Sequence, residues 1–167
     1  MISESLTLPC GALIRNRLCK AAMTEGLADP QGQPTEALNQ LYDIWSQGGA
    51  GLLLSGNVQI DGDHLERPGN VIVDSEPSVA MQVALERWAA AGTRSGNHFW
   101  AQISHAGRQC QKAVNSRPKA PSGIKLGLPG GQFGEPVPMT EEDIEAVIAG
   151  FSRCAKVLVN AGFTGVQ

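Results

Sequence analysis

The sequence lacks several features that would assign it to a particular class of protein. It contains no run of about 18 apolar residues, so no membrane-spanning segment is expected. Its charges nearly balance, with 13 Lys and Arg against 16 Asp and Glu, and no basic excess indicates nucleic-acid binding. The acidic N-terminus, MISE, has no signal-peptide pattern. We therefore expect a cytoplasmic protein with neither a membrane nor a nucleic-acid partner.

Motifs for metal sites, disulfides and phosphate loops are also missing. The four cysteines form no CxxC pair, and without an export signal we expect reduced thiols. The three histidines have neither HExxH nor zinc-finger spacing, so no metal site is expected. The segment MTEG at residues 23–26 is neither a GxGxxG nor a Walker loop.

Short apolar runs alternate with amphipathic segments along the chain. The 167 residues are 42% hydrophobic, enough to bury the core of one domain or of part of a larger one. A hairpin is expected over residues 6–14, with its turn near 9–11. The apolar runs at residues 17–23, 51–60, 98–104 and 163–167 predict four strands.

Helical spacing between these runs predicts three helices. The first buries one face and ends at Gly48–Gly49; that face is Leu38, Leu41, Tyr42 and Trp45. The second is closed by Gly92; its buried face is Met81, Ala84, Leu85 and Trp88. The third starts from Thr140 as N-cap; its buried face is Ile144, Val147, Ile148, Phe151, Ala155 and Leu158.

This alternation of strands and helices predicts an α/β fold with parallel strands and right-handed crossovers. A doubly wound sheet and a (β/α) barrel both satisfy the pattern. The polar residues Thr24, Asn57, Gln102 and His105 follow or end the predicted strands, where barrel enzymes carry their chemistry. A full barrel has eight strands, and this chain supplies four.

Five segments in order carry a resemblance to a known family. They are NRLCKAAMT (16–24), GGAGLLLSGN (48–57), AQISHAGR (101–108), APS (120–122) and AGFTGVQ (161–167). Together they resemble the Old Yellow Enzyme family, FMN-dependent NAD(P)H oxidoreductases, in its ene-reductase and 2,4-dienoyl-CoA reductase branch. The resemblance implies that residues 1–167 are strands one to four of an FMN-binding domain, the N-terminal half of a TIM (β/α)8 barrel.

The resemblance also implies which residues contact the flavin. Ala22, Met23 and Thr24 would lie against the ring, with Thr24 bonded near its O4 and N5 atoms. Gln102 would pair with the pyrimidine edge through its amide. Asn57 stands where the family usually has Ala or Gly beside the flavin. The residues alone leave an alternative role for two of these positions. Thr24 can cap the loop backbone at the end of the strand, and Gln102 can form hydrogen bonds inside the barrel without contacting a flavin.

Three further residues are substrate or loop candidates. Gly26 stands where several relatives place an aromatic side chain over the substrate. Arg108 would face an anionic substrate, the cofactor or an interface. His105 is interpreted as a structural histidine rather than a general acid. The segment 115–139 would cover part of the active-site mouth, or else form a mobile surface loop. Lys20 in the first strand must pair or reach solvent, or else it carries a desolvation penalty.

No catalytic residue is assigned within the chain. In the family, the His pair that holds the substrate carbonyl and the proton-donating Tyr would follow Gln167. The implied activity is ping-pong reduction of activated alkenes by NADH or NADPH through FMN. For this chain alone we expect weak or absent FMN affinity and no turnover. Its outer strands invite closure by a second copy or by the complementary half.

Two other functions remain open from the sequence. The chain can be a non-catalytic half-barrel that acts by association with itself or with a complementary half. It can also be part of another barrel enzyme with a phosphorylated substrate.

Overall fold

The computed structural model describes residues 1–167. The chain begins with an antiparallel hairpin of β1 (Leu6–Thr7) and β2 (Leu13–Ile14), as the sequence predicts. Its turn closes through a hydrogen bond from the Gly11 amide to the Leu8 carbonyl, with Gly11 at φ 87°. A positive φ is a conformation that glycine adopts without steric cost.

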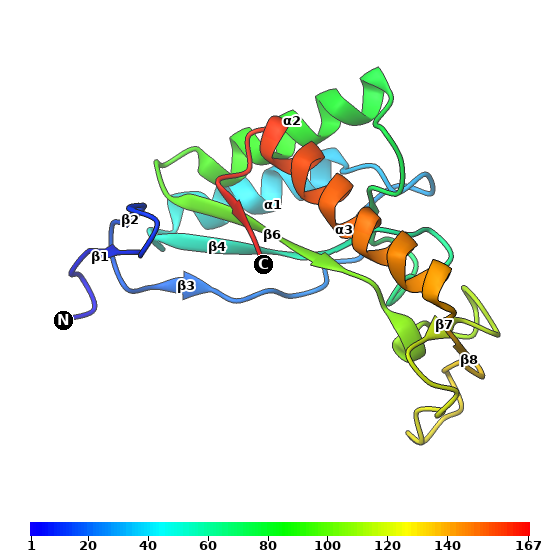
Figure 1. Ribbon diagram of the computed structural model, residues 1–167. Helices are drawn as coiled ribbons and strands as arrows, with labels where there is room; N and C mark the ends of the chain where they lie inside the picture. The colour runs from blue at the N-terminus through cyan, green and yellow to red at the C-terminus, as the bar shows by residue number, and fades with distance from the viewer.

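A parallel sheet forms the centre of the molecule (Figure 1). Its strands β3 (Cys19–Lys20), β4 (Leu52–Gln59), β6 (His98–Ser104) and β9 (Gly165–Val166) lie in that order. The four predicted strands and their parallel pairing are therefore confirmed, although the ladder of β3 is only two residues long. A fifth strand, β5 (Val71–Ile72), pairs with the end of β4 and was not predicted.

All three helices cover one face of this sheet (Figure 1). They are α1 (Glu36–Gln47), α2 (Val79–Thr93) and α3 (Glu141–Asn160). Thr140 is the N-cap of α3 and forms a reciprocal capping box with Asp143, as its sequence position suggests. None of the helices combines the length and the apolar character needed to cross a membrane.

The core lies between the helices and the sheet. Four aromatic rings meet there: Tyr42 of α1, Trp88 of α2, Phe99 of β6 and Phe163 just before β9. The Phe99 ring centroid is 4.7 Å from those of Tyr42 and Phe163 and 5.6 Å from that of Trp88. These ring contacts fix α1 and α2 against the centre of the sheet.

The end of α2 differs from the prediction. Gly92 does not close the helix, which continues to Thr93, and the glycine with positive φ is Gly96 at 74°. The Phe99 ring packs directly on Gly92, where a Cβ atom would come within 2.7 Å of the ring carbon Cγ. Gly92 is therefore required for close packing and not for termination.

The predicted buried face of α3 is wrong at three positions. Ile144, Ile148 and Phe151 are 40%, 55% and 37% exposed. The face that packs on the sheet consists instead of Gly150, Cys154, Val157 and Leu158. The apolar arc of α3 is wider than the face that this sheet covers, and periodicity alone could not say which part is buried.

The predicted loop between β6 and α3 contains three short elements. They are a 3-10 turn η1 (Gly107–Gln109) and a parallel pair of β7 (Lys119–Ala120) with β8 (Val137–Pro138). This pair lies apart from the central sheet, beyond the end of β6 (Figure 1).

Candidate functional site

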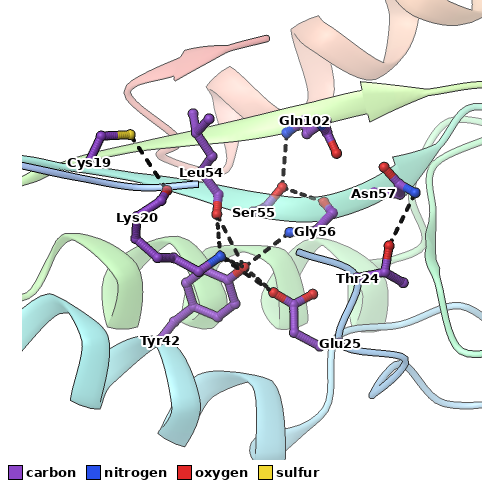
Figure 2. Close-up of polar contacts among 10 residues, drawn as sticks. All are labelled: Cys19, Lys20, Thr24, Glu25, Tyr42, Leu54, Ser55, Gly56, Asn57 and Gln102. Carbon is purple, nitrogen blue, oxygen red and sulfur yellow. Dashed lines mark hydrogen bonds and ion pairs between the residues drawn. The ribbon is translucent and has the colours of Figure 1, made fainter. Parts of the chain in front are cut away.

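Three of the predicted cofactor residues form a row across the sheet. Asn57 of β4 and Gln102 of β6 are register partners, and the Asn57 Nδ2 atom donates to Thr24 Oγ1 at 3.3 Å (Figure 2). Gln102 Nε2 donates in turn to Gln167 Oε1 at 3.0 Å. Because Ala101 is buried on the helix side, Gln102 faces the opposite side of the sheet. The row therefore lies on the face that carries no helix.

A β-bulge in β4 aims Asn57 into this row. Leu54 pairs with Trp100 and Asn57 with Gln102, so β4 contains one residue more than β6 between these pairs. Within the bulge, Ser55 Oγ accepts the Gln102 amide proton at 2.9 Å and donates to the Gly56 carbonyl at 2.6 Å. A bulge re-aims a side chain and often lies beside a functional site.

Lys20 is buried on the helix side of the sheet and is paired (Figure 2). Its ammonium group donates to the Leu54 carbonyl at 2.7 Å and to the Tyr42 hydroxyl at 3.3 Å. It lies 3.8 Å from the Glu25 carboxylate and 4.3 Å from the centre of the Trp45 ring. Of the possibilities left by the sequence, Lys20 therefore pairs rather than reaching solvent or staying unpaired.

Tyr42 completes this group of side chains. Its hydroxyl accepts the Gly56 amide proton at 3.1 Å and donates to the Glu25 carboxylate. Burial lowers the pKa of Lys20, an effect that Glu25 opposes. Burial, together with the Glu25 carboxylate, raises the pKa of Tyr42 well above its usual value, so the hydroxyl keeps its proton. The sequence predicted Tyr42 as a core residue but not as part of a polar group, and it gave Glu25 no role. Neither residue belongs to a motif.

The segment from Ala22 to Gly26 approaches β4 closely at Gly56. Met23 is 50% exposed and Ala22 is half-buried. A Cβ on Gly56 would lie 2.5 Å from the Met23 carbonyl oxygen, so only glycine permits this close approach. Gly26, at φ 68°, packs closely on Gly69 of the loop after β4.

His105 joins a second cluster, with Asp61 and His64. The His64 and His105 rings stack with centroids 4.5 Å apart, and His64 Nδ1 lies 2.8 Å from Asp61 Oδ2. The His64 Nε2 atom accepts the Lys119 amide proton at 2.8 Å, which places the ring proton on Nδ1, facing Asp61. Both His64 nitrogens are thus engaged within the protein, and His105 joins the His64–Asp61 pair by ring stacking. No motif points to Asp61 or His64.

Two side chains of this cluster, Asp61 and His105, have pKa values shifted from the usual ones. The hydrogen bond from His64 holds the pKa of Asp61 below its usual value. Burial, reinforced by His64, lowers the pKa of His105. His105 Nδ1 accepts the Gly107 amide proton at 3.2 Å, which suits the neutral ring. The interpretation of His105 as a structural histidine stays a prediction.

Two neighbouring cavities open around His105, away from the row. One, of about 750 Å³, is lined by Arg108, Ser122 and Phe151 among others. The other, of about 560 Å³, is lined by Asp61, His64 and Arg153 among others. Arg108 is exposed and lines the cavity of about 750 Å³.

The NADH:flavin oxidoreductase / NADH oxidase family matches residues 9–167 of the chain. The protein belongs to this family. The NADH-dependent flavin oxidoreductase iliE of Hypocrea jecorina is 32% identical to this family member over 180 residues, covering 99% of the chain and 45% of the relative. The iliE protein of Neonectria sp. is 35% identical over 179 residues, covering 98% of the chain and 23% of the relative.

Solved structures show the fold of this family member. The Old Yellow Enzyme homologue from Zymomonas mobilis superposes with a TM-score of 0.84 at 24% identity, over 99% of the chain and 47% of that structure. Morphinone reductase superposes with a TM-score of 0.80 at 21% identity, over 99% and 46%. The chain is thus the N-terminal part of a TIM barrel, as predicted, and it spans less than half the length of these relatives.

The polar row offers the groups that a flavin ring requires. The oxygens Asn57 Oδ1 and Gln102 Oε1 have no protein partner, and the Thr24 hydroxyl accepts from Asn57 while keeping its own proton to donate. The pyrimidine edge of a flavin presents one N–H group and two carbonyl oxygens, which such acceptors and donors complement. The row contains no Lys or Arg side chain.

Proposed function

We propose that this chain forms the ring-binding wall of an FMN-dependent oxidoreductase that reduces activated alkenes with NADH or NADPH. The observation that supports this most directly is the row of Thr24, Asn57 and Gln102 on the helix-free face. Membership of a flavin oxidoreductase family supports flavin as the ligand.

Each residue of the row has a defined part in this proposal. The Gln102 amide orients the pyrimidine edge of the ring. The Thr24 hydroxyl donates toward O4 and N5, and the backbone of Ala22 and Met23 lies against the ring. The bound flavin supplies the two-electron chemistry of a ping-pong hydride transfer between the nicotinamide and the alkene.

The groups that bind the substrate carbonyl and donate a proton are proposed to come from a complementary half. We propose that no residue among 1–167 serves as the family's substrate-binding His pair or as its proton-donating Tyr. We propose that a complementary half or a second copy of the chain closes the barrel, and that the protein works in the cytoplasm on a small electron-poor alkene.

Titration of the isotope-labelled chain with FMN tests the proposal. Weak binding is expected, and it should shift the NMR signals of Thr24, Asn57 and Gln102 before any others. Gln102→Ala should raise the dissociation constant about fivefold, since one hydrogen bond contributes about 1 kcal/mol. Gln40→Ala, on the exposed face of α1, serves as the matched control and should leave binding unchanged.

Other results would contradict the proposal in different ways. Signals that stay fixed in the row at saturating FMN would exclude it as the flavin wall. Shifts confined to the cavities around His105 would point to a barrel enzyme of another substrate class. A stable oligomer that never takes up flavin would favour a half-barrel that acts only by association.

A further inference from the structure

Lys20, Glu25 and Tyr42, here called the buried triad, join the bulge of β4 to the segment that carries Thr24 (Figure 2). The Lys20 and Glu25 side chains are 11% and 9% exposed, and Tyr42 is fully buried. All three lie on the helix side of the sheet, behind the polar row. The proposed function gives none of them a role.

The triad satisfies two backbone groups of the irregular part of β4. The Leu54 carbonyl accepts from the Lys20 ammonium at 2.7 Å, and the Gly56 amide donates to the Tyr42 hydroxyl at 3.1 Å. A buried backbone group without a partner is costly, so a bulge needs such substitutes. Lys20 and Tyr42 therefore fix the shape of the bulge, and the bulge aims Asn57.

The same triad also anchors the other side of the row. Glu25 directly follows Thr24, and its carboxylate accepts from Tyr42 and faces Lys20. The Tyr42 hydroxyl thus contacts both the amide that precedes Asn57 and the carboxylate that follows Thr24. A single oxygen atom links the two segments that the Thr24–Asn57 hydrogen bond joins on the other face.

Stability alone is a weak explanation for this arrangement. Desolvating an ammonium and a carboxylate offsets most of their attraction, and apolar residues of similar size often serve a core as well or better. A charged pair that contacts a bulge is instead directional, because its hydrogen bonds specify where the backbone lies. The contribution of the triad is therefore to geometry.

We infer that Lys20, Glu25 and Tyr42 are positioning residues that hold Thr24 and Asn57 at the spacing a flavin ring requires. None of them touches the ring, so they act through the bulge and through the 22–26 segment. The inference rests on the proposed function and deepens it. It predicts that altering the triad weakens FMN binding although every residue of the row is still present.

The test compares Glu25→Gln and Tyr42→Phe with Glu36→Gln, an exposed control at the start of α1. In the flavin-free chain, Tyr42→Phe should speed hydrogen exchange of the Gly56 amide about tenfold, the effect of losing one hydrogen bond. Both triad variants should shift the NMR signals of Thr24 and of the Asn57 side chain. Each should raise the FMN dissociation constant five- to tenfold, about the effect of one hydrogen bond, and Glu36→Gln should change none of these.

Circular dichroism confirms that each variant is folded, and Lys20→Met provides a further variant if either one unfolds. Unchanged Thr24 and Asn57 signals together with wild-type FMN affinity in the folded variants would overturn the inference and leave the proposed function intact. A wild-type chain whose row ignores FMN would overturn the proposed function. Exchange of the Gly56 amide would then still show whether the triad holds the bulge.

Discussion

His105 is a titratable side chain whose pKa is lowered by burial and by the neighbouring His64. Asp61 opposes this shift, and the Gly107 amide donates to His105 Nδ1 at 3.2 Å. Asp143 and Arg153 line the same cavity as His105. The pKa of His105 is lower in the folded chain than in the unfolded chain, where it is about 6.5. Between these two pKa values the unfolded chain therefore binds more protons than the folded chain. Stability should therefore fall as the pH drops from about 7 through the folded pKa of His105.

His105→Gln should flatten this pH dependence, because Gln does not titrate. Melting temperatures measured between about pH 7.5 and pH 5 compare the variant with the wild type over the range where histidine titrates. Their curves should converge toward acid pH, since only the wild type loses the contribution of the neutral ring. Parallel curves would show that His105 does not couple protonation to folding. Asp61 titrates at lower pH and leaves this comparison unaffected.

At the scale of single residues, the sequence identifies the row but not what supports it. Thr24, Asn57 and Gln102 end predicted strands, and parallel strands bring such ends together. Glu25 and His64 are different, because their partners, Tyr42 and Lys119, are 17 and 55 residues away along the chain. No local pattern encodes such a pairing, so only the folded structure reveals it.

Between elements, the contact of α2 with β6 depends on Gly92. A Cβ there would lie 2.6 Å from Phe99 Cε1 and 2.7 Å from Cγ, and the ring is held by Tyr42, Trp88 and Phe163. Gly92→Ala should lower the free energy of unfolding by about 1–3 kcal/mol, the cost of overpacking a core. The gain in helix propensity, about 1 kcal/mol, offsets only part of the strain.

Urea denaturation measures this loss. Gly127→Ala is the control, since a Cβ at Gly127 meets no atom within 4 Å. Equal stability of Gly92→Ala and the wild type would mean that the Phe99 ring moves aside at no cost and that the contact does not fix α2.

The helices were predictable because each repeats apolar residues with a helical period over at least twelve residues. The two-residue strands β5, β7 and β8 were not predicted, because they lie outside the apolar runs from which the strands were inferred. The prediction of the buried face of α3 was wrong for another reason. Its apolar arc includes both the side that packs on the sheet and a second side that nothing in residues 1–167 covers.

For the whole molecule, three surfaces are open at once. The outer strands β3 and β9 each pair on one side only, and the polar row lies on a face without helices (Figure 1). The exposed apolar side of α3 consists of Ile144, Ile148, Phe151 and Val159, and the half-buried Ala155 lies on the same helix face. Exposed apolar patches of this kind mark interaction sites. A second copy or a complementary half-barrel would cover them together.

We expect the isolated chain to self-associate through α3, with sedimentation showing a mean mass that rises with concentration. Ile148→Lys should raise the dissociation constant by about tenfold or more, because an ammonium group would be buried without a partner. Ala149→Lys adds the same charge one residue further, on the polar side of α3, and should leave association unchanged. A wild-type chain that stays monomeric at high concentration would contradict association. Equal effects of the two lysines would place the contact away from the apolar side of α3, at the open strand edges.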